Sequence, residues 1–379
     1  MPPAAGVAGR DLRANSAYTL HAWESVPHEY RPSLSAVLDP ATEAGVLDPA
    51  AVAGVLVAEP GSPLPDKVVG SAGAALFLRL QRPGPAPDVP PDTLAGLVLD
   101  GVLEIRADDG FRSGLAAHEL VLQPRAWPAG GGRVSQLSLA ALSYAERLPL
   151  TAGVPTVRLY GFGRVPLSGR WTRAYPGRDA VLDLLRPAGL ERHWSGTDRT
   201  GWLSWHRRGA PRPPLPYKLY VSPHPDELAE VLPAAVAALA GTGANQFKVG
   251  PDAAGLLRPD KFVVYLRDAA ELRAVAAELT RALAGARPHG VPFSAELTGD
   301  GLLSWGGDPP RDAGPVGPRP ESWRLSVCRR LAEHLVAAKA AGLPALRPAQ
   351  YALARVALDG VRLPAFAPAA LPEPGEVAA

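Results

Sequence analysis

The segment from Tyr217 to Pro310 constrains the fold most, because the spacing of its apolar residues changes several times within a short length. Apolar residues that alternate with polar ones predict a strand, whereas apolar residues spaced three or four apart predict a helix. In chain order the segment gives a strand, a helix, two strands and a second helix, over residues 217–222, 225–239, 246–249, 262–266 and 268–284. This order predicts an α+β fold with a small mixed or antiparallel sheet and flanking helices.

Lysine is rare in this chain and is concentrated in that segment. Only five of the 39 basic residues are lysines, and three of them, Lys218, Lys248 and Lys261, lie close together in the sequence. An arginine keeps its charge, whereas a buried lysine can lose its proton. The bias therefore favours a site that needs an amine, with chance clustering as the alternative.

Cationic side chains fall at defined places in the strand pattern. Lys218, Tyr220 and Ser222 project from one face of the first strand, because successive side chains of a strand alternate. The second strand presents Lys248, and the loop Arg258-Pro-Asp-Lys261 precedes the third. Arginine suits bidentate contact with phosphate oxygens and lysine suits point-charge contact, so the set predicts a phosphate site. Two plainer interpretations stay open: a solvated sheet face, and a surface turn closed by an internal salt bridge.

Composition excludes several classes of protein. With 47% hydrophobic and 20% charged residues, the chain is expected to be globular, and 379 residues predict two or three domains. A net charge of +2 provides no broad field for nucleic acid or an anionic membrane, so neither is expected as a partner. The single cysteine, Cys328, excludes an internal disulfide and a multi-cysteine metal site. No signal peptide or spanning segment is evident, and a cytoplasmic protein is expected.

A glycine-rich joint near residue 130 predicts the domain boundary. Residues 1–130 are expected to form a mainly helical accessory domain that recognises a peptide or a partner, and residues 131–379 a second domain with the catalytic segment 217–310. Near the end of the first domain, a helix over 94–103 is followed by a strand, turn and strand to Gly114. This order indicates a winged-helix hairpin or a plain α+β capping domain.

The same segment resembles the HopA-like effector family. The resemblance runs from about residue 137 to 368, and its motifs are Tyr-Lys-Leu-Tyr-Val-Ser-Pro, Phe-Lys-Val-Gly, Leu-Leu-Arg-Pro-Asp-Lys-Phe-Val-Val-Tyr, Val-Pro-Phe-Ser-Ala-Glu-Leu and Gly-Leu-Leu-Ser-Trp-Gly-Gly-Asp-Pro-Pro. Bacterial members occur as lyase components in class V lanthipeptide and thioamitide biosynthesis, and the family is similar to phosphothreonine lyases.

The resemblance implies a carbon–oxygen lyase with a phosphothreonine-lyase-like core. Such an enzyme eliminates phosphate from phosphoserine or phosphothreonine of a ribosomal precursor peptide, giving dehydroalanine or dehydrobutyrine, as in antibiotic (RiPP) biosynthesis. No cofactor or metal is expected. The chain has no kinase motif of its own, so the phosphorylated peptide and a phosphotransferase-like kinase are the expected partners.

The family's motifs also imply roles for individual residues. A Lys-x-His strand motif supplies the base and the acid there, and it falls on Lys218 and Tyr220 here. The Phe-Lys strand and the Arg-x-x-Lys loop hold phosphate, which implies that role for Lys248, Arg258 and Lys261. Crowding by these cations is expected to depress the pKa of Lys218 and to make it the base.

The proton donor and the peptide contacts stay open. Tyr220 occupies the position of the family's histidine, and it can donate a proton if the cations lower its pKa; His224 is a second candidate. The remaining candidates for substrate binding are Ser222, Tyr160, Arg164 and Arg170.

Two other functions compete with the lyase. A non-catalytic phosphopeptide-binding or scaffold subunit needs the same cations, and the missing histidine favours it. An effector-like interaction protein needs no phosphate site at all.

Overall fold

The computed structural model describes residues 6–7, 9–30, 35–36, 52–62, 64–122, 131–148, 154–199, 201–211, 213–308, 321–342, 347–369 and 371–372. The chain divides into two compact units. Unit 1 comprises Met1–Trp127, Pro310–Glu321 and His334–Gly360, and unit 2 comprises Pro128–Pro309, Ser322–Glu333 and Val361–Ala379. Residues 334–360, expected in the second domain, thus group with unit 1, and the accessory role of the N-terminal region stays a prediction.

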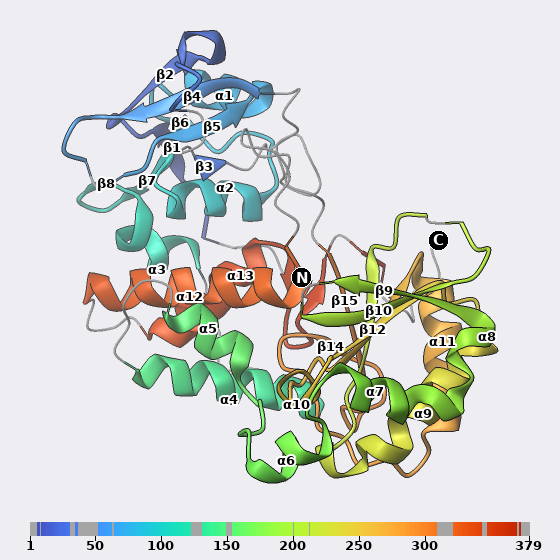
Figure 1. Ribbon diagram of the computed structural model, residues 1–379. Helices are drawn as coiled ribbons and strands as arrows, with labels where there is room; N and C mark the ends of the chain where they lie inside the picture. The colour runs from blue at the N-terminus through green and yellow to red at the C-terminus, as the bar shows by residue number, and fades with distance from the viewer. Residues whose placement is uncertain are drawn as a thin grey trace. The chain divides into compact units, whose positions relative to one another are not determined.

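A seven-stranded antiparallel sheet forms the centre of unit 2 (Figure 1). Its strands lie in the order β14 (Ala295–Glu296), β15 (Leu303–Gly307), β11 (Tyr217–Val221), β13 (Phe262–Leu266), β12 (Gln246–Val249), β10 (Trp202–Arg207) and β9 (Trp194–Arg199). The predicted strands β11, β12 and β13 are therefore present, side by side, in a wider sheet than expected. The α+β class is confirmed.

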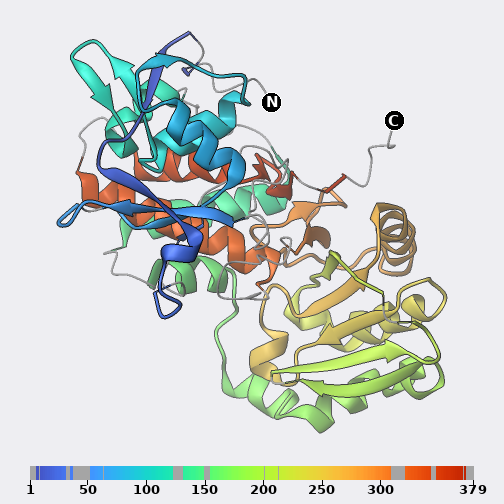
Figure 2. The same cartoon turned by 90° about the horizontal axis from the view of Figure 1, so that it is seen from above.

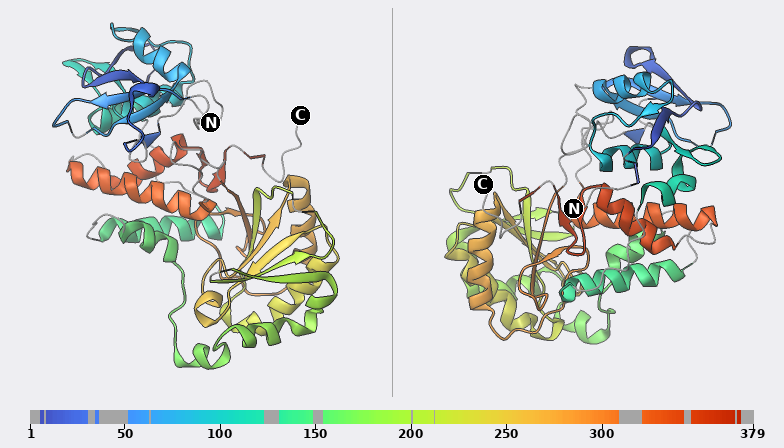
Figure 3. Two further views of the ribbon diagram at one scale, coloured as in Figure 1. Left: turned by 45° about the horizontal axis from the view of Figure 1, so that its top comes forward. Right: turned by 180° about the vertical axis from the view of Figure 1, so that it is seen from behind.

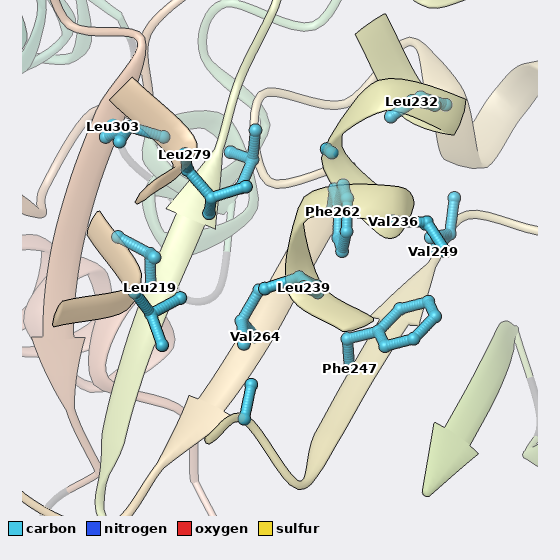
Figure 4. Close-up of a cluster of buried hydrophobic side chains, with 14 of the residues drawn as sticks. Leu219, Leu232, Val236, Leu239, Phe247, Val249, Phe262, Val264, Leu279 and Leu303 are labelled. Carbon is cyan, nitrogen blue, oxygen red and sulfur yellow. The ribbon is translucent and has the colours of Figure 1, made fainter. Parts of the chain in front are cut away.

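One face of this sheet packs on two helices, α9 (Leu228–Ala240) and α11 (Ala269–Ala282), which lie on the same side in Figure 3. Alternate strand residues such as Leu219, Phe247 and Val264 project into the resulting core, which also contains Leu232, Val236 and Leu239 of α9 (Figure 4). Burial of such side chains contributes about 1.5–3 kcal/mol each. The period-2 alternation then directs Lys218 and Lys248 to the opposite face of the sheet.

The remaining elements of unit 2 surround the sheet. The helix that follows the glycine-rich joint is α4 (Arg133–Arg147). The others are α5 (Val154–Gly161), α6 (Gly169–Ala174), α7 (Arg178–Leu185), α8 (Leu190–His193), α10 (Ala253–Leu256), the first part of α12 (Trp323–Ala341) and the strands β16 (Val361–Arg362) and β17 (Ala367–Pro368).

Unit 1 contains two four-stranded sheets, drawn mostly in blue in Figure 2. The first has the order β6 (Gly84–Pro85), β1 (Asp11–Ala14), β7 (Leu103–Ala107) and β8 (Gly110–Arg112). The second has the order β2 (Tyr18–Ala22), β4 (Val52–Ala58), β5 (Lys67–Gly70) and β3 (Ser35–Ala36). The helices are α1 (Ser71–Arg79), α2 (Pro91–Leu99), α3 (His118–Val121), the end of α12 and α13 (Pro348–Leu358).

The N-terminal region was expected to be mainly helical, but its two sheets give unit 1 more strand than predicted. Runs such as Val52–Ala58 are short, apolar and rich in β-branched valine, and a run of this length fits a strand better than a helix. The predicted helix and hairpin are α2, β7 and β8, and the hairpin joins a sheet with β1 and β6. In the described part of the chain, no helix has the length and apolar character required to cross a membrane.

Candidate active site

Two transverse rows of side chains cross the face of the unit 2 sheet that lies opposite α9 and α11. In one row Lys218 of β11 lies opposite Tyr265 of β13. In the next row Tyr220 lies opposite Val263, and Val263 lies opposite Lys248 of β12. The predicted placement of Lys218 and Tyr220 on one face therefore holds, and the register brings Lys248 to the same face.

Cations and aromatic rings alternate across this face. We call the set the cation–ring row; it consists of Lys218, Tyr265, Lys248, Trp202, Arg258 and Tyr160. The amine nitrogens of Lys218 and Lys248 lie 5.3 and 5.4 Å from the centroid of the same Tyr265 ring. The Lys248 nitrogen is also 4.1 Å from the Trp202 ring, and the Arg258 guanidinium carbon is 4.8 Å from that ring. Rings accept cations at such distances.

Within the row, Lys218 is held by a carboxylate that lies just after the end of β15. Its ammonium group forms an ion pair with Asp308, and its side chain is only 7% exposed. Asp308 also accepts a hydrogen bond of 3.3 Å from the backbone nitrogen of Trp323, the first residue of α12. The ion pair therefore fixes the position of the Lys218 amine at one end of the row.

Lys248 has a different environment. Burial, and then the nearby charge of Lys218, lowers the pKa of Lys248 from its ordinary 10.5 to about 8. Among the described residues no carboxylate forms an ion pair with it. Two neighbouring lysines thus differ in kind: one is paired, and the other is readily deprotonated.

Arg258 is oriented by Asp260 and Tyr160. Its Nε and Nη2 donate to the two oxygens of Asp260 at 2.9 and 3.0 Å, and Nη2 also donates to the Tyr160 hydroxyl at 2.9 Å. The internal salt bridge considered for this loop is therefore present. Bidentate phosphate contact through the Nε–Nη2 edge is not available in this arrangement, and Nη1 is the group left to face a ligand.

A buried arginine that the sequence did not single out completes this cluster. Arg324 of α12 is 1% exposed and pairs with Asp260 at 2.9 Å. It also donates to the carbonyl oxygens of Pro292 and Tyr160. Burial alone would raise the pKa of Asp260, but Arg324 and Arg258 hold it well below its usual range. In the sequence, the signal for this role would have been an arginine on the buried side of a predicted helix.

Lys261 lies outside the cation–ring row, in contrast to its predicted role. Its side chain is fully buried and donates to the carbonyl oxygen of Pro223 at 2.9 Å and to Nδ1 of His289 at 2.8 Å. Nε2 of His289 in turn donates to the carbonyl oxygen of Gly163 at 2.7 Å. Burial lowers the pKa of Lys261 to about 7 and, together with Lys261, that of His289 to about 3. These contacts tie three loops together.

Replacing Lys261 with methionine is therefore expected to lower stability and to leave phosphopeptide affinity unchanged. The change strands the Pro223 carbonyl and the His289 ring without a donor, at a cost of about 1–3 kcal/mol each. Urea denaturation and isothermal titration with a phosphopeptide measure the two effects. If a folded variant loses much of its affinity for the phosphopeptide, Lys261 is part of the phosphate site.

Two further candidates are buried. Tyr220 packs with Val263 and Val291, and burial raises its pKa well above 10, whereas its role as proton donor was conditional on the cations lowering that pKa. Loss of hydration outweighs the cations because the phenolate would have no water around it. Ser222 is fully buried and donates to the carbonyl oxygen of Pro259 at 2.7 Å, which occupies its hydroxyl proton.

The other peptide-binding candidates lie in exposed contacts separate from the row. Arg170 pairs with Asp226 at 2.7 Å, and His224 contacts the same carboxylate at 3.5 Å. Arg164 donates to the carbonyl oxygen of Ala254. Tyr160 alone among these candidates joins the row. In the described residues no group of three or more His, Cys, Asp or Glu side chains could hold a metal ion.

Comparison with known proteins gives distant structural likenesses only. No protein-family model and no curated protein matches the chain. The structure of an effector protein from Pseudomonas syringae pv. tomato strain DC3000 is 13% identical, with a TM-score of 0.38, covering 64% of this chain and 99% of its own. An effector from Pseudomonas syringae pv. syringae strain 61 is 13% identical, with a TM-score of 0.37, covering 57% and 98%. The phosphothreonine lyase OspF from Shigella flexneri is 10% identical, with a TM-score of 0.28, covering 46% and 90%. Similarity at this level assigns neither family nor activity to the chain.

Proposed function

We propose that unit 2 is a lyase that eliminates phosphate from phosphoserine or phosphothreonine residues of a peptide. The observation that carries the proposal is the pairing of unlike amines on one sheet face: Lys248, with a pKa of about 8, lies beside Lys218, which forms an ion pair with Asp308. A β-elimination needs both a neutral base and a fixed positive charge. A surface of solvated lysines would supply neither.

Lys248 is the base in this proposal, in preference to Lys218. At pH 8 about half of a group with a pKa near 8 is neutral, whereas well under about 1% of a lysine with the ordinary pKa of 10.4 is neutral. The neutral amine takes the α-proton of the phosphorylated residue. The electrons of the broken C–H bond form the Cα–Cβ double bond, and the Cβ–O bond breaks so that its electron pair leaves with the phosphate.

The other groups have complementary roles. Lys218 stabilises the negative charge that develops on the carbonyl oxygen next to the α-carbon. Nη1 of Arg258 contacts the phosphate. Tyr220, whose raised pKa keeps its proton in place, donates a hydrogen bond to the leaving oxygen.

Charge balance supports an anionic ligand here. With Lys248 neutral, three cations remain in or beside the row, and they face only the carboxylates of Asp260 and Asp308. One positive charge is therefore left without a partner at the site, and a phosphate group brings about two negative charges. A half-buried location strengthens that attraction relative to bulk water.

The proposed biological setting follows the family resemblance of the sequence. We infer a cytoplasmic step in lanthipeptide-type peptide biosynthesis, in which a separate kinase phosphorylates a precursor peptide before this chain acts on it. Unit 1 would then recognise the precursor or the kinase.

Mass spectrometry of a phosphorylated precursor peptide incubated with the full chain tests the proposal. We expect the peptide to lose the mass of phosphoric acid and to form an adduct with an added thiol, because dehydroalanine and dehydrobutyrine react with thiols. Loss of phosphate alone, with the hydroxyl restored, would instead identify a phosphatase. If the peptide binds tightly but remains unchanged, the result would favour the alternative function, a non-catalytic phosphopeptide-binding subunit.

A further inference from the structure

The two lysines that flank the Tyr265 ring have the same distance to it but not the same partners. Both amines lie within 5.5 Å of the ring centroid, at 5.3 and 5.4 Å. Only Lys218 has a carboxylate, that of Asp308. The asymmetry of the site therefore originates in one side chain, the carboxylate of Asp308.

The fold places Asp308 beside Lys218 from two directions. Lys218 lies opposite Gly306 of β15, and Asp308 follows two residues later on the same face, where its backbone nitrogen donates to the carbonyl oxygen of Pro216 at 3.0 Å. The carboxylate also accepts the hydrogen bond from Trp323. A Cβ atom at Gly306 would come within 2.5 Å of the Trp323 side chain, so glycine is needed for α12 to begin there. Asp308 is thus fixed by backbone contacts on both sides.

We propose that Asp308 is a positioning residue that assigns opposite protonation states to the two amines, and so decides which of them is the base. The inference rests on the proposed lyase function and deepens it. With the carboxylate present, the proton stays on Lys218, and Lys248 is the amine that gives up its own. Without the carboxylate, the two adjacent ammonium groups repel one another, and neither loses its proton in preference to the other. The two groups then titrate as a pair.

Other charged groups around Lys248 do not create this preference. The groups that act on it are Lys218, Asp260, Arg258 and Asp308. Asp260 is already engaged by two guanidinium groups, and the rings of Trp202 and Tyr265 are neutral. Asp308 is therefore the group in this set that distinguishes Lys218 from Lys248.

The pH dependence of elimination by Asp308→Asn tests the proposal. In the wild type, kcat/KM should rise with pH as Lys248 loses its proton and fall again as Lys218 does. Asparagine keeps the oxygen that accepts from Trp323 but removes the charge beside Lys218, so the high-pH limb should move to lower pH by more than the low-pH limb does, and the maximum should fall several-fold. Asp308→Glu should retain the wild-type limbs. A lower rate with both limbs unmoved would show a merely structural role and overturn the proposal.

A second measurement does not depend on activity. The chain has five lysines, so limited labelling with a small amine-reactive reagent, followed by peptide mass spectrometry, reports on each of them separately. In the wild type the reactivity of Lys248 should rise at lower pH than that of Lys218. In Asp308→Asn the two midpoints should converge, and unchanged midpoints would contradict the proposal. If the wild type shows this order but eliminates no phosphate, the lyase function fails while the role of Asp308 stands.

Discussion

Replacing Lys248 with methionine is expected to lower kcat for phosphate elimination by at least about 100-fold, the usual range for loss of a general base. Methionine preserves much of the apolar stem that packs on the rings of Trp202 and Tyr265, so the fold should be retained. The Kd for the phosphopeptide should change by less than about tenfold, because Lys218 and Arg258 still carry their charges.

Two further variants distinguish the role of Lys248 as a base from its role as a positive charge. Lys248→Arg restores a cation that cannot deprotonate, so it should bind phosphopeptide as well as the wild type and yet fail to eliminate phosphate. Lys218→Met removes one of the causes that lower the pKa of Lys248, so the low-pH limb of the rate profile should move to higher pH. Lys339→Met in α12 is the matched control outside the site. Full activity of Lys248→Arg would exclude an amine base at this position.

The local part of the fold could be predicted from the sequence. Strands β11, β12 and β13 were expected within one residue of their observed ends, because period-2 alternation is a local signal. The strands β9 and β10 were not predicted. β10 pairs with β12, and this pairing joins residues some forty positions apart, a separation that leaves no local pattern.

The candidate site divides in the same way. Lys218 and Lys248 were placed on one face by strand alternation, and their juxtaposition needed only that β11 and β12 both pair with β13. Trp202, Asp308 and Arg324 reach the site from β10, the end of β15 and α12, so only tertiary structure brings them in. Lys261 lies away from the cation–ring row because it precedes β13, where strand alternation no longer fixes the direction of a side chain.

Asp260→Asn is expected to lower the free energy of unfolding by about 3–5 kcal/mol, the usual cost of removing one partner from a buried ion cluster. Arg324 is 1% exposed and would keep its charge without a compensating carboxylate, and Arg258 would lose both of its charged contacts. Urea denaturation followed by tryptophan fluorescence suits this test, because six of the eight tryptophans lie in unit 2. Asp226→Asn, which removes the partner of the exposed Arg170, is the control and should cost less than about 1 kcal/mol.

The pH dependence and the effect of phosphate make the same prediction sharper. The folded-state pKa of Asp260 is lowered, so its contribution to stability is present above the unfolded pKa of about 4 and is lost as the pH falls further. The difference in the free energy of unfolding between Asp260→Asn and the wild type should therefore be constant from about pH 5 to 8 and shrink in acid.

In the variant the Nε–Nη2 edge of Arg258 is released, and an added anion can take the place of the carboxylate. Inorganic phosphate should consequently raise the Tm of Asp260→Asn more than that of the wild type, because a ligand stabilises the folded state that binds it better. Equal shifts in the two proteins would show that phosphate does not reach Arg258, and would remove this residue from the proposed phosphate site.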